Sequence, residues 1–207
     1  IIYTGSKDNS LYAVCTNGTL SWKYKTYGEI HSVPAIANGK VCFGSENPDF
    51  SVYCLNSTTG EALWRHTFYR KEYFEGGMFH APPAMIGNRV LIGEEGGKRG
   101  VRSSGVSVSP SPSKFYAFDA ETGNISWEFA ASDWIVTAPA VAYGKVFFST
   151  KWSGDVYALN VSDGSLVWKA EGNSAPVVAG GSVFVGSAGA IYSFDADTGK
   201  LLWKHET

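Results

Sequence analysis

The 207-residue sequence has no hydrophobic run long enough to cross a bilayer, and it has few charged residues. A membrane-spanning helix needs about 18–20 apolar residues, and no stretch approaches that length. Charged residues make up 17% of the chain, and 17 Lys+Arg against 19 Asp+Glu give a net charge of −2, which argues against a nucleic-acid partner. A hydrophobic fraction of 44% excludes a disordered chain. We therefore expect a globular protein with no membrane span and no bound nucleic acid.

The motifs of common catalytic sites are also missing. The sequence contains no Cys-x-x-Cys-His for haem attachment, no His-Glu-x-x-His, no Gly-x-Ser-x-Gly and no phosphate-binding loop. Paired acids such as Asp195 and Asp197 recur at predicted turns, where Asp ordinarily caps the backbone. These absences favour a protein without enzymatic activity, and we predict no catalytic residue.

A repeat runs through the whole sequence. It consists of a Tyr, a Gly seven positions later and a Trp four positions after that. Four copies match this spacing, and a fifth copy is one residue shorter: Tyr53–Gly60–Trp64, Tyr116–Gly123–Trp127, Tyr157–Gly164–Trp168, Tyr192–Gly199–Trp203 and the short Tyr12–Gly18–Trp22. The successive Trp residues lie 42, 63, 41 and 35 positions apart, so one unit carries a large insertion.

Each unit is predicted to form four short strands. In the second unit these strands cover residues 33–37, 40–44, 51–56 and 62–66, separated by turns with Gly at positions that suit a positive φ. A repeated four-stranded unit of this length predicts an all-β protein with the β-propeller fold. We predict a single domain, residues 1–207, with about five blades at residues 1–26, 27–68, 69–130, 131–171 and 172–207. The first blade lacks its innermost strand, which leaves residues 2–5 as an open edge. A neighbouring chain could complete this blade, a strand beyond Thr207 could complete it if the sequence is a fragment, or the ring could tolerate one three-stranded blade.

Two segments carry a resemblance to a known family. They are APAVAYGKVFFSTKWSGDVYALNVSDGSLVW (residues 138–168) and LYAVCTNGTLSW (residues 11–22). Both resemble the repeats of the pyrroloquinoline-quinone (PQQ)-like propellers, also called the quinoprotein or BamB-like family, and the resemblance covers essentially the whole chain. It implies radial blades whose first strand is innermost. The recurrent Trp of each blade is then expected to fill the wedge between neighbouring sheets.

Candidate binding residues lie in connections predicted to share one face of the propeller. His31 and His80 occupy equivalent positions, three residues before a Pro that opens a blade. Two His could bind a metal, but no third ligand is evident, so we expect hydrogen-bonded structural histidines and predict no metal site. Arg99 and Arg102, in the insertion at residues 94–114, either contact an anion or are solvated loop charges.

Trp134 and Trp152 lie in connections on the same face and do not belong to the recurrent Trp set. Exposed Trp can stack on a sugar ring or contact a partner protein, whereas packing over a blade edge would be purely structural. The sequence leaves both interpretations open.

Four Asn-x-Ser/Thr triplets begin at Asn17, Asn56, Asn124 and Asn160, each at or beside the same turn of a different blade. Turn preference would explain them, but we favour N-linked glycosylation of an outer edge, and hence a secreted or cell-surface protein.

The hairpin around Pro48 places Cys42 opposite Cys54, which allows a cross-strand disulfide. Cys15 is then either free or linked to another chain.

Two functions follow. The first is a non-catalytic extracellular or cell-surface scaffold, without a cofactor, that binds a protein partner, glycans or copies of itself in a surface assembly or filament. The second, implied by the resemblance, is a fragment of a PQQ-dependent dehydrogenase, which would need PQQ, calcium and a catalytic Asp that cannot be assigned to residues of this chain. The sequence opens on Ile1 rather than Met, so we expect a processed product or a piece of a longer chain.

Overall fold

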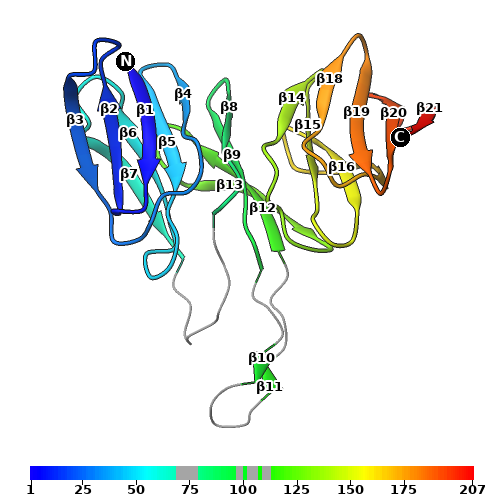
Figure 1. Ribbon diagram of the computed structural model, residues 1–207, viewed down its shortest axis with the longest axis horizontal. Helices are drawn as coiled ribbons and strands as arrows, with labels where there is room; N and C mark the ends of the chain where they lie inside the picture. The colour runs from blue at the N-terminus through cyan, green and yellow to red at the C-terminus, as the bar shows by residue number, and fades with distance from the viewer. Residues whose placement is uncertain (69–78, 97–99, 102–106, 109–112) are drawn as a thin grey trace.

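The computed structural model describes residues 1–68, 79–96, 100–101, 107–108 and 113–207. These residues form five antiparallel sheets arranged as a fan, with the first and last sheets at its two ends (Figure 1). The first sheet has three strands and each of the others has four, which confirms the predicted β-propeller with an incomplete first blade. No helix occurs in the described ranges, and so none that could span a membrane.

The strands follow the sequence repeat closely. The first two sheets are formed by β1 (Ile2–Ser6), β2 (Ser10–Val14) and β3 (Leu20–Lys25), and by β4 (Ala35–Ala37), β5 (Lys40–Gly44), β6 (Ser51–Asn56) and β7 (Ala62–Thr67). The third sheet contains β8 (Ala84–Ile86), β9 (Arg89–Gly93), β12 (Ser113–Asp119) and β13 (Ile125–Ala131), and β10 (Gly100–Val101) pairs with β11 (Ser107–Val108) in a separate hairpin. The last two sheets contain β14 (Ala140–Ala142), β15 (Lys145–Ser149), β16 (Asp155–Asn160) and β17 (Leu166–Glu171), and β18 (Val177–Ala179), β19 (Ser182–Ser187), β20 (Ala190–Asp195) and β21 (Leu201–Glu206).

The first strand of each four-stranded sheet lies innermost. Strand β4 contacts β8, β8 contacts β14, and β14 contacts β18, so these short strands surround a common centre. Strand β4 begins at Ala35 rather than at residue 33 as predicted. Pro34 has no N–H to donate to the ladder, so pairing starts only after it.

The recurrent Gly and Trp form the joint between neighbouring sheets. The indole of each of the first four blades packs on the turn Gly of the next blade. An added Cβ there would approach the ring to between 2.5 and 2.7 Å in the pairs Trp22–Gly60, Trp64–Gly123, Trp127–Gly164 and Trp168–Gly199. Each indole N–H also donates to a carbonyl of that turn, at Ser57, Ala120, Val161 and Ala196 respectively. The Gly and the Trp of the sequence repeat therefore keep a constant spacing because they form the same contact between neighbouring sheets, and this contact occurs four times along the chain.

The expectation that all five recurrent Trp residues are buried between sheets is wrong for the last one. Trp203 on β21 is 46% exposed, whereas Trp168 on the equivalent strand of the preceding sheet is 7% exposed. The reason is positional, because the described residues place no further sheet beyond β21 to cover this ring.

The second sheet carries a covalent cross-link. Cys42 on β5 and Cys54 on β6 are directly opposed in the strand register and form a disulfide. Both residues are fully buried in the cluster of apolar side chains that packs this sheet against the third one. Cys15 is half-buried and free.

Candidate functional site

Polar side chains from the second and third sheets converge where the chain enters the inner strands. His31 precedes β4, His80 precedes β8, and Glu46 follows β5. Glu95 follows β9 in the same way, because Glu46 and Glu95 each stand two residues after the Gly that ends a strand. The repeat therefore places two His and two Glu at equivalent positions of adjacent blades, and we call His31, Glu46 and His80 the inner cluster.

The three residues of the inner cluster meet at one carboxylate oxygen. Glu46 Oε1 lies 2.7 Å from His31 Nδ1 and 2.6 Å from His80 Nε2. The two imidazole rings lie parallel, with centroids 5.5 Å apart. The Glu46 side chain is 9% exposed, and its Oε1 has no aligned hydrogen-bond donor among the described residues. A buried carboxylate oxygen without such a donor is unfavourable, so this arrangement calls for a positive charge.

Each histidine also contacts a second carboxylate through its other nitrogen. His31 Nε2 lies 2.6 Å from Glu29 Oε2, and His80 Nδ1 lies 2.9 Å from Glu95 Oε1. Contacts with Glu46 and then Glu95 raise the pKa of the His80 imidazole to about 10, against the opposing effect of burial. The two rings thus bridge three carboxylates, which is a dense arrangement of titratable groups at the centre of the fan.

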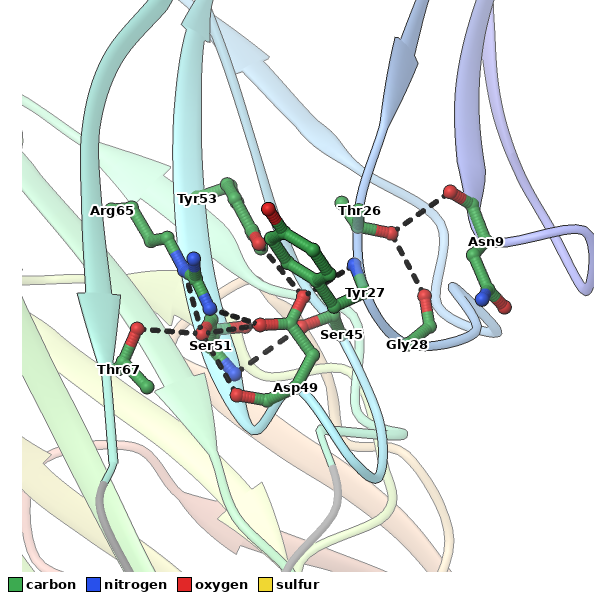
Figure 2. A network of polar contacts seen from close by, with 10 residues as sticks. All are labelled: Asn9, Thr26, Tyr27, Gly28, Ser45, Asp49, Ser51, Tyr53, Arg65 and Thr67. Atoms are coloured by element: carbon green, nitrogen blue, oxygen red, sulfur yellow. Dashed lines mark hydrogen bonds and ion pairs between the residues drawn. The ribbon is translucent and has the colours of Figure 1, made fainter.

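A hydrogen-bonded network holds the loop that carries Glu46 (Figure 2). Its centre is Asp49, which accepts hydrogen bonds from Arg65 Nη2 at 2.6 Å and from the Tyr53 hydroxyl at 2.7 Å. Ser51 Oγ donates to the same carboxylate at 2.8 Å, and the backbone N–H of Tyr27 adds a fourth contact from the connection between β3 and β4. Burial alone would raise the pKa of Asp49, but the hydrogen bonds from Tyr53 and Ser51 hold it below its ordinary value.

The backbone of the Glu46 loop is fixed from two sides. Glu46 N–H donates to the Glu29 carbonyl at 2.9 Å, and the Asp49 N–H donates to the Glu46 carbonyl at 2.9 Å. Gly28 lies so close that a Cβ at this position would be 2.1 Å from the Glu46 carbonyl oxygen. The connection between β3 and β4 therefore positions Glu46, which lies in the connection between β5 and β6.

The structure places the other candidate residues apart from the inner cluster or outside the described residues. Trp134 is half-buried and Trp152 is 72% exposed, and Lys151 Nζ lies over both rings, at 5.8 Å and 5.1 Å from their centroids. These two Trp residues thus share a small aromatic and basic surface. Arg99 and Arg102 lie outside the residues that the structure describes.

The four sequon asparagines differ in accessibility. Asn17 and Asn124 are exposed, whereas Asn56 and Asn160 are half-buried. The Asn56 carboxamide oxygen accepts the backbone N–H groups of Thr58 and Thr59, as an Asx turn requires.

Sequence reasoning identified the two His of the cluster and missed the glutamates. The expectation of no metal site rested on the lack of an evident third ligand, and Glu46 supplies a group of that kind. A signal was available, because Glu46 and Glu95 follow Gly44 and Gly93 at the same spacing in adjacent blades. The spacing alone does not reveal which side chains at the strand ends point toward the histidines.

The sheets, the inner strands and the Trp–Gly joints define a β-propeller of repeated four-stranded blades. The family model described as outer membrane protein assembly factor BamB matches residues 1–104 and 48–207, so together the matches cover the whole chain. The chain belongs to this BamB-like family of PQQ-type propellers, as the repeats suggested.

The curated relatives of the chain include two kinds of protein. The outer membrane protein assembly factor BamB of Yersinia pestis is 28% identical over 167 residues, covering 74% of this chain and 38% of the relative. A quinohemoprotein alcohol dehydrogenase of Pseudomonas putida is 24% identical over 240 residues, covering 100% of this chain and 31% of the relative. The chain thus spans well under half the length of either relative.

Solved structures of both kinds share the fold. BamB from Moraxella catarrhalis superposes with a TM-score of 0.72 at 18% identity, covering 98% of this chain and 57% of that one. A europium-containing methanol dehydrogenase superposes with a TM-score of 0.80 at 16% identity, covering 99% of this chain and 49% of that one. At these identities the similarity concerns the fold alone.

Proposed function

We propose that this chain is a non-catalytic binding module of the cell envelope or the extracellular space, which uses the faces of its sheets to hold protein partners. The similarity to BamB, an outer membrane protein assembly factor, supports both the scaffold role and the location. For the 207 residues taken by themselves, the partner that we propose is a second copy of the chain, bound head to tail; in a longer chain a further blade would occupy the same face.

The exposed face of the last sheet carries this proposal. Trp203 is flanked by two further exposed apolar residues of β21, Leu201 and Leu202. In four earlier blades the equivalent Trp is packed on a turn Gly with positive φ and bonded to a carbonyl of that turn. The β21 face therefore presents one half of an interface that the molecule makes four times with itself.

The first sheet presents the other half of the same interface. Gly18 is the repeat glycine of that sheet, with φ of +86° and no atom within 4 Å of the position where a Cβ would lie. By the same alignment, the Thr16 carbonyl is equivalent to the Ser57 carbonyl that accepts the Trp22 indole N–H. Trp203 of one copy can thus bind the Gly18 turn of the next, and such a heterologous contact generates open chains of subunits.

Light scattering across a range of protein concentrations tests this contact. We expect the average mass to rise with concentration in the wild-type chain and to stay at the monomer value in Trp203→Ala. Trp152→Ala is the matched control, because it removes an exposed Trp elsewhere and should leave the association unchanged. A wild-type chain that remains monomeric at every concentration would contradict the head-to-tail contact.

The alternative function is a PQQ-dependent dehydrogenase, and the match of the entire chain to a quinohemoprotein alcohol dehydrogenase favours it. In that case added PQQ and calcium should bind together. A rise in melting temperature, with a change in the absorbance of PQQ at micromolar concentration, would support the dehydrogenase. The non-catalytic module predicts no change in either quantity.

A further inference from the structure

We propose that His31, Glu46 and His80 form a binding site for one divalent transition-metal ion, zinc by its ligand chemistry, with Glu29 and Glu95 as the carboxylates that orient the two histidines. The site is independent of the assembly proposed above.

The protonation pattern of the two rings is the first argument. All four ring nitrogens of the two histidines face a carboxylate oxygen, and the nitrogens that face Glu29 and Glu95 can keep their protons when the other two bind a metal. A neutral imidazole has its lone pair on the other nitrogen. In that neutral form His31 Nδ1 and His80 Nε2 both direct lone pairs toward Glu46 Oε1, so the three atoms converge on one point where either a metal ion or protons on the imidazoles supply the positive charge.

The donor set is the second argument. The three ligand atoms all lie within 4.8 Å of one another, and two imidazoles with one carboxylate are ligands that zinc commonly takes. Bonds of about 2.0–2.2 Å in tetrahedral geometry separate ligand atoms by roughly 3.3 Å. The present distances of 2.6 and 2.7 Å mean that the Glu46 oxygen would move away from each nitrogen by well under 1 Å.

The surroundings of the histidines are the third argument. Histidines that bind metals usually donate their second ring N–H to a carboxylate, which fixes the tautomer and increases the basicity of the ligand nitrogen. Both His31 and His80 have such a partner, in Glu29 and Glu95. With three carboxylates around two neutral rings, a dication also offsets most of the local negative charge.

Calcium fits this site less well than zinc. Calcium takes six to eight oxygen ligands, whereas two of the three inner groups offer nitrogen. Three protein ligands leave one tetrahedral position for a water molecule or for a group of a partner protein. The alternative state of the cluster contains no metal, and extra protons on the imidazoles then supply the positive charge.

Metal analysis of the chelator-treated protein separates these states. We expect equilibrium dialysis and calorimetry to detect one bound zinc ion per chain, and we expect zinc to raise the melting temperature. Glu46→Gln and His31→Ala should remove this binding. Glu95→Gln keeps all three ligands and should weaken zinc binding by about 10–100-fold. His205→Gln is the control, because it removes an exposed His on β21, at the far end of the fan.

Several outcomes would overturn the proposal. If zinc does not bind, or if Glu46→Gln binds it as tightly as the wild type does, then the cluster is not a metal site and protonated imidazoles alone supply its positive charge. If calcium with PQQ binds in place of zinc, and His31→Ala abolishes that binding, the site belongs to a dehydrogenase. Far-ultraviolet circular dichroism confirms that each variant is folded. Light scattering of the same variants reports separately on the head-to-tail contact, so the two proposals can fail independently.

Discussion

At the scale of single residues, two separate constraints require glycine at the turn position of the repeat: a positive φ and the close approach of a Trp ring. Gly123 has a φ of +71° and also lies against the Trp64 ring, whereas Gly144 has a nearly identical φ of +70° and open space around it. Comparing the two positions separates the cost of an unusual backbone conformation from the cost of a blocked joint between sheets.

We expect Gly144→Ala to lower the free energy of unfolding by about 1–2 kcal/mol, the cost of placing a Cβ in the left-handed region. Gly123→Ala should cost about 2–4 kcal/mol, because its Cβ also displaces the Trp64 ring. Denaturant unfolding measures both values. Equal losses in the two variants would show that the joint tolerates a methyl group.

Accessibility also decides which sequons can be modified. We expect N-linked glycan on Asn17 and Asn124, which are exposed, and little on Asn56 and Asn160, which are half-buried. Glycopeptide mass spectrometry of protein from its native source measures the occupancy of each site. An unmodified intact mass would remove the glycans and with them one argument for secretion.

At the scale of whole strands, the joint between sheets predicts an asymmetry between equivalent residues. Trp168 on β17 is covered by the next sheet, and Trp203 on β21 is not. Trp168→Ala should therefore destabilise the protein by about 3–5 kcal/mol, as truncation of a buried aromatic side chain does. Trp203→Ala, measured in dilute solution, should cost less than about 1 kcal/mol. Similar losses would mean that another part of the molecule covers Trp203.

The loop between β5 and β6 depends on the Asp49 carboxylate in the same way. Asp49→Asn removes the negative charge and one of the two oxygens that accept from Arg65 and Tyr53, so we expect a loss of about 1–3 kcal/mol at neutral pH. Because folding lowers the pKa of Asp49, its stabilisation is complete above the ordinary value of 3.8 and is lost as the pH falls through the lower folded value. The difference between wild type and variant should therefore shrink in acid, which unfolding at several pH values checks.

The elements were predictable from sequence because each blade repeats its own local pattern. The strand spacing, the turn glycines and the opposition of Cys42 and Cys54 all depend on residues within one blade. The inner cluster was not predictable to the same degree. Glu46 reaches the histidines only because Gly28 and the Asp49 network set its loop, and those contacts join two separate connections, between β3 and β4 and between β5 and β6. For the same reason the exposure of Trp203 could not be read from a motif that four other blades share.

At the scale of the whole molecule, the sheets differ in how many neighbours cover them. The second, third and fourth sheets each lie between two others, whereas the first and the last lie at the ends of the fan (Figure 1). Strand β1 is in addition an edge strand, because within the described residues it pairs only with β2. Cooperative stability should therefore decrease from the middle of the fan toward both ends.

Hydrogen exchange followed by mass spectrometry measures this gradient. In dilute solution we expect the amides of β2 and β20 to exchange faster than those of β6, β12 and β16, the equivalent interior strands of the middle sheets, because the terminal sheets open without disturbing two joints. At high concentration, head-to-tail association would cover the Gly18 turn of one copy and the Trp203 face of the next, so protection should rise at both ends together. Trp203→Ala should keep the dilute pattern of exchange at every concentration.

Equal protection of the end strands and the middle strands in the dilute monomer would contradict the gradient of stability. A rise in protection at only one end of the fan would contradict a head-to-tail contact, because that contact covers both ends.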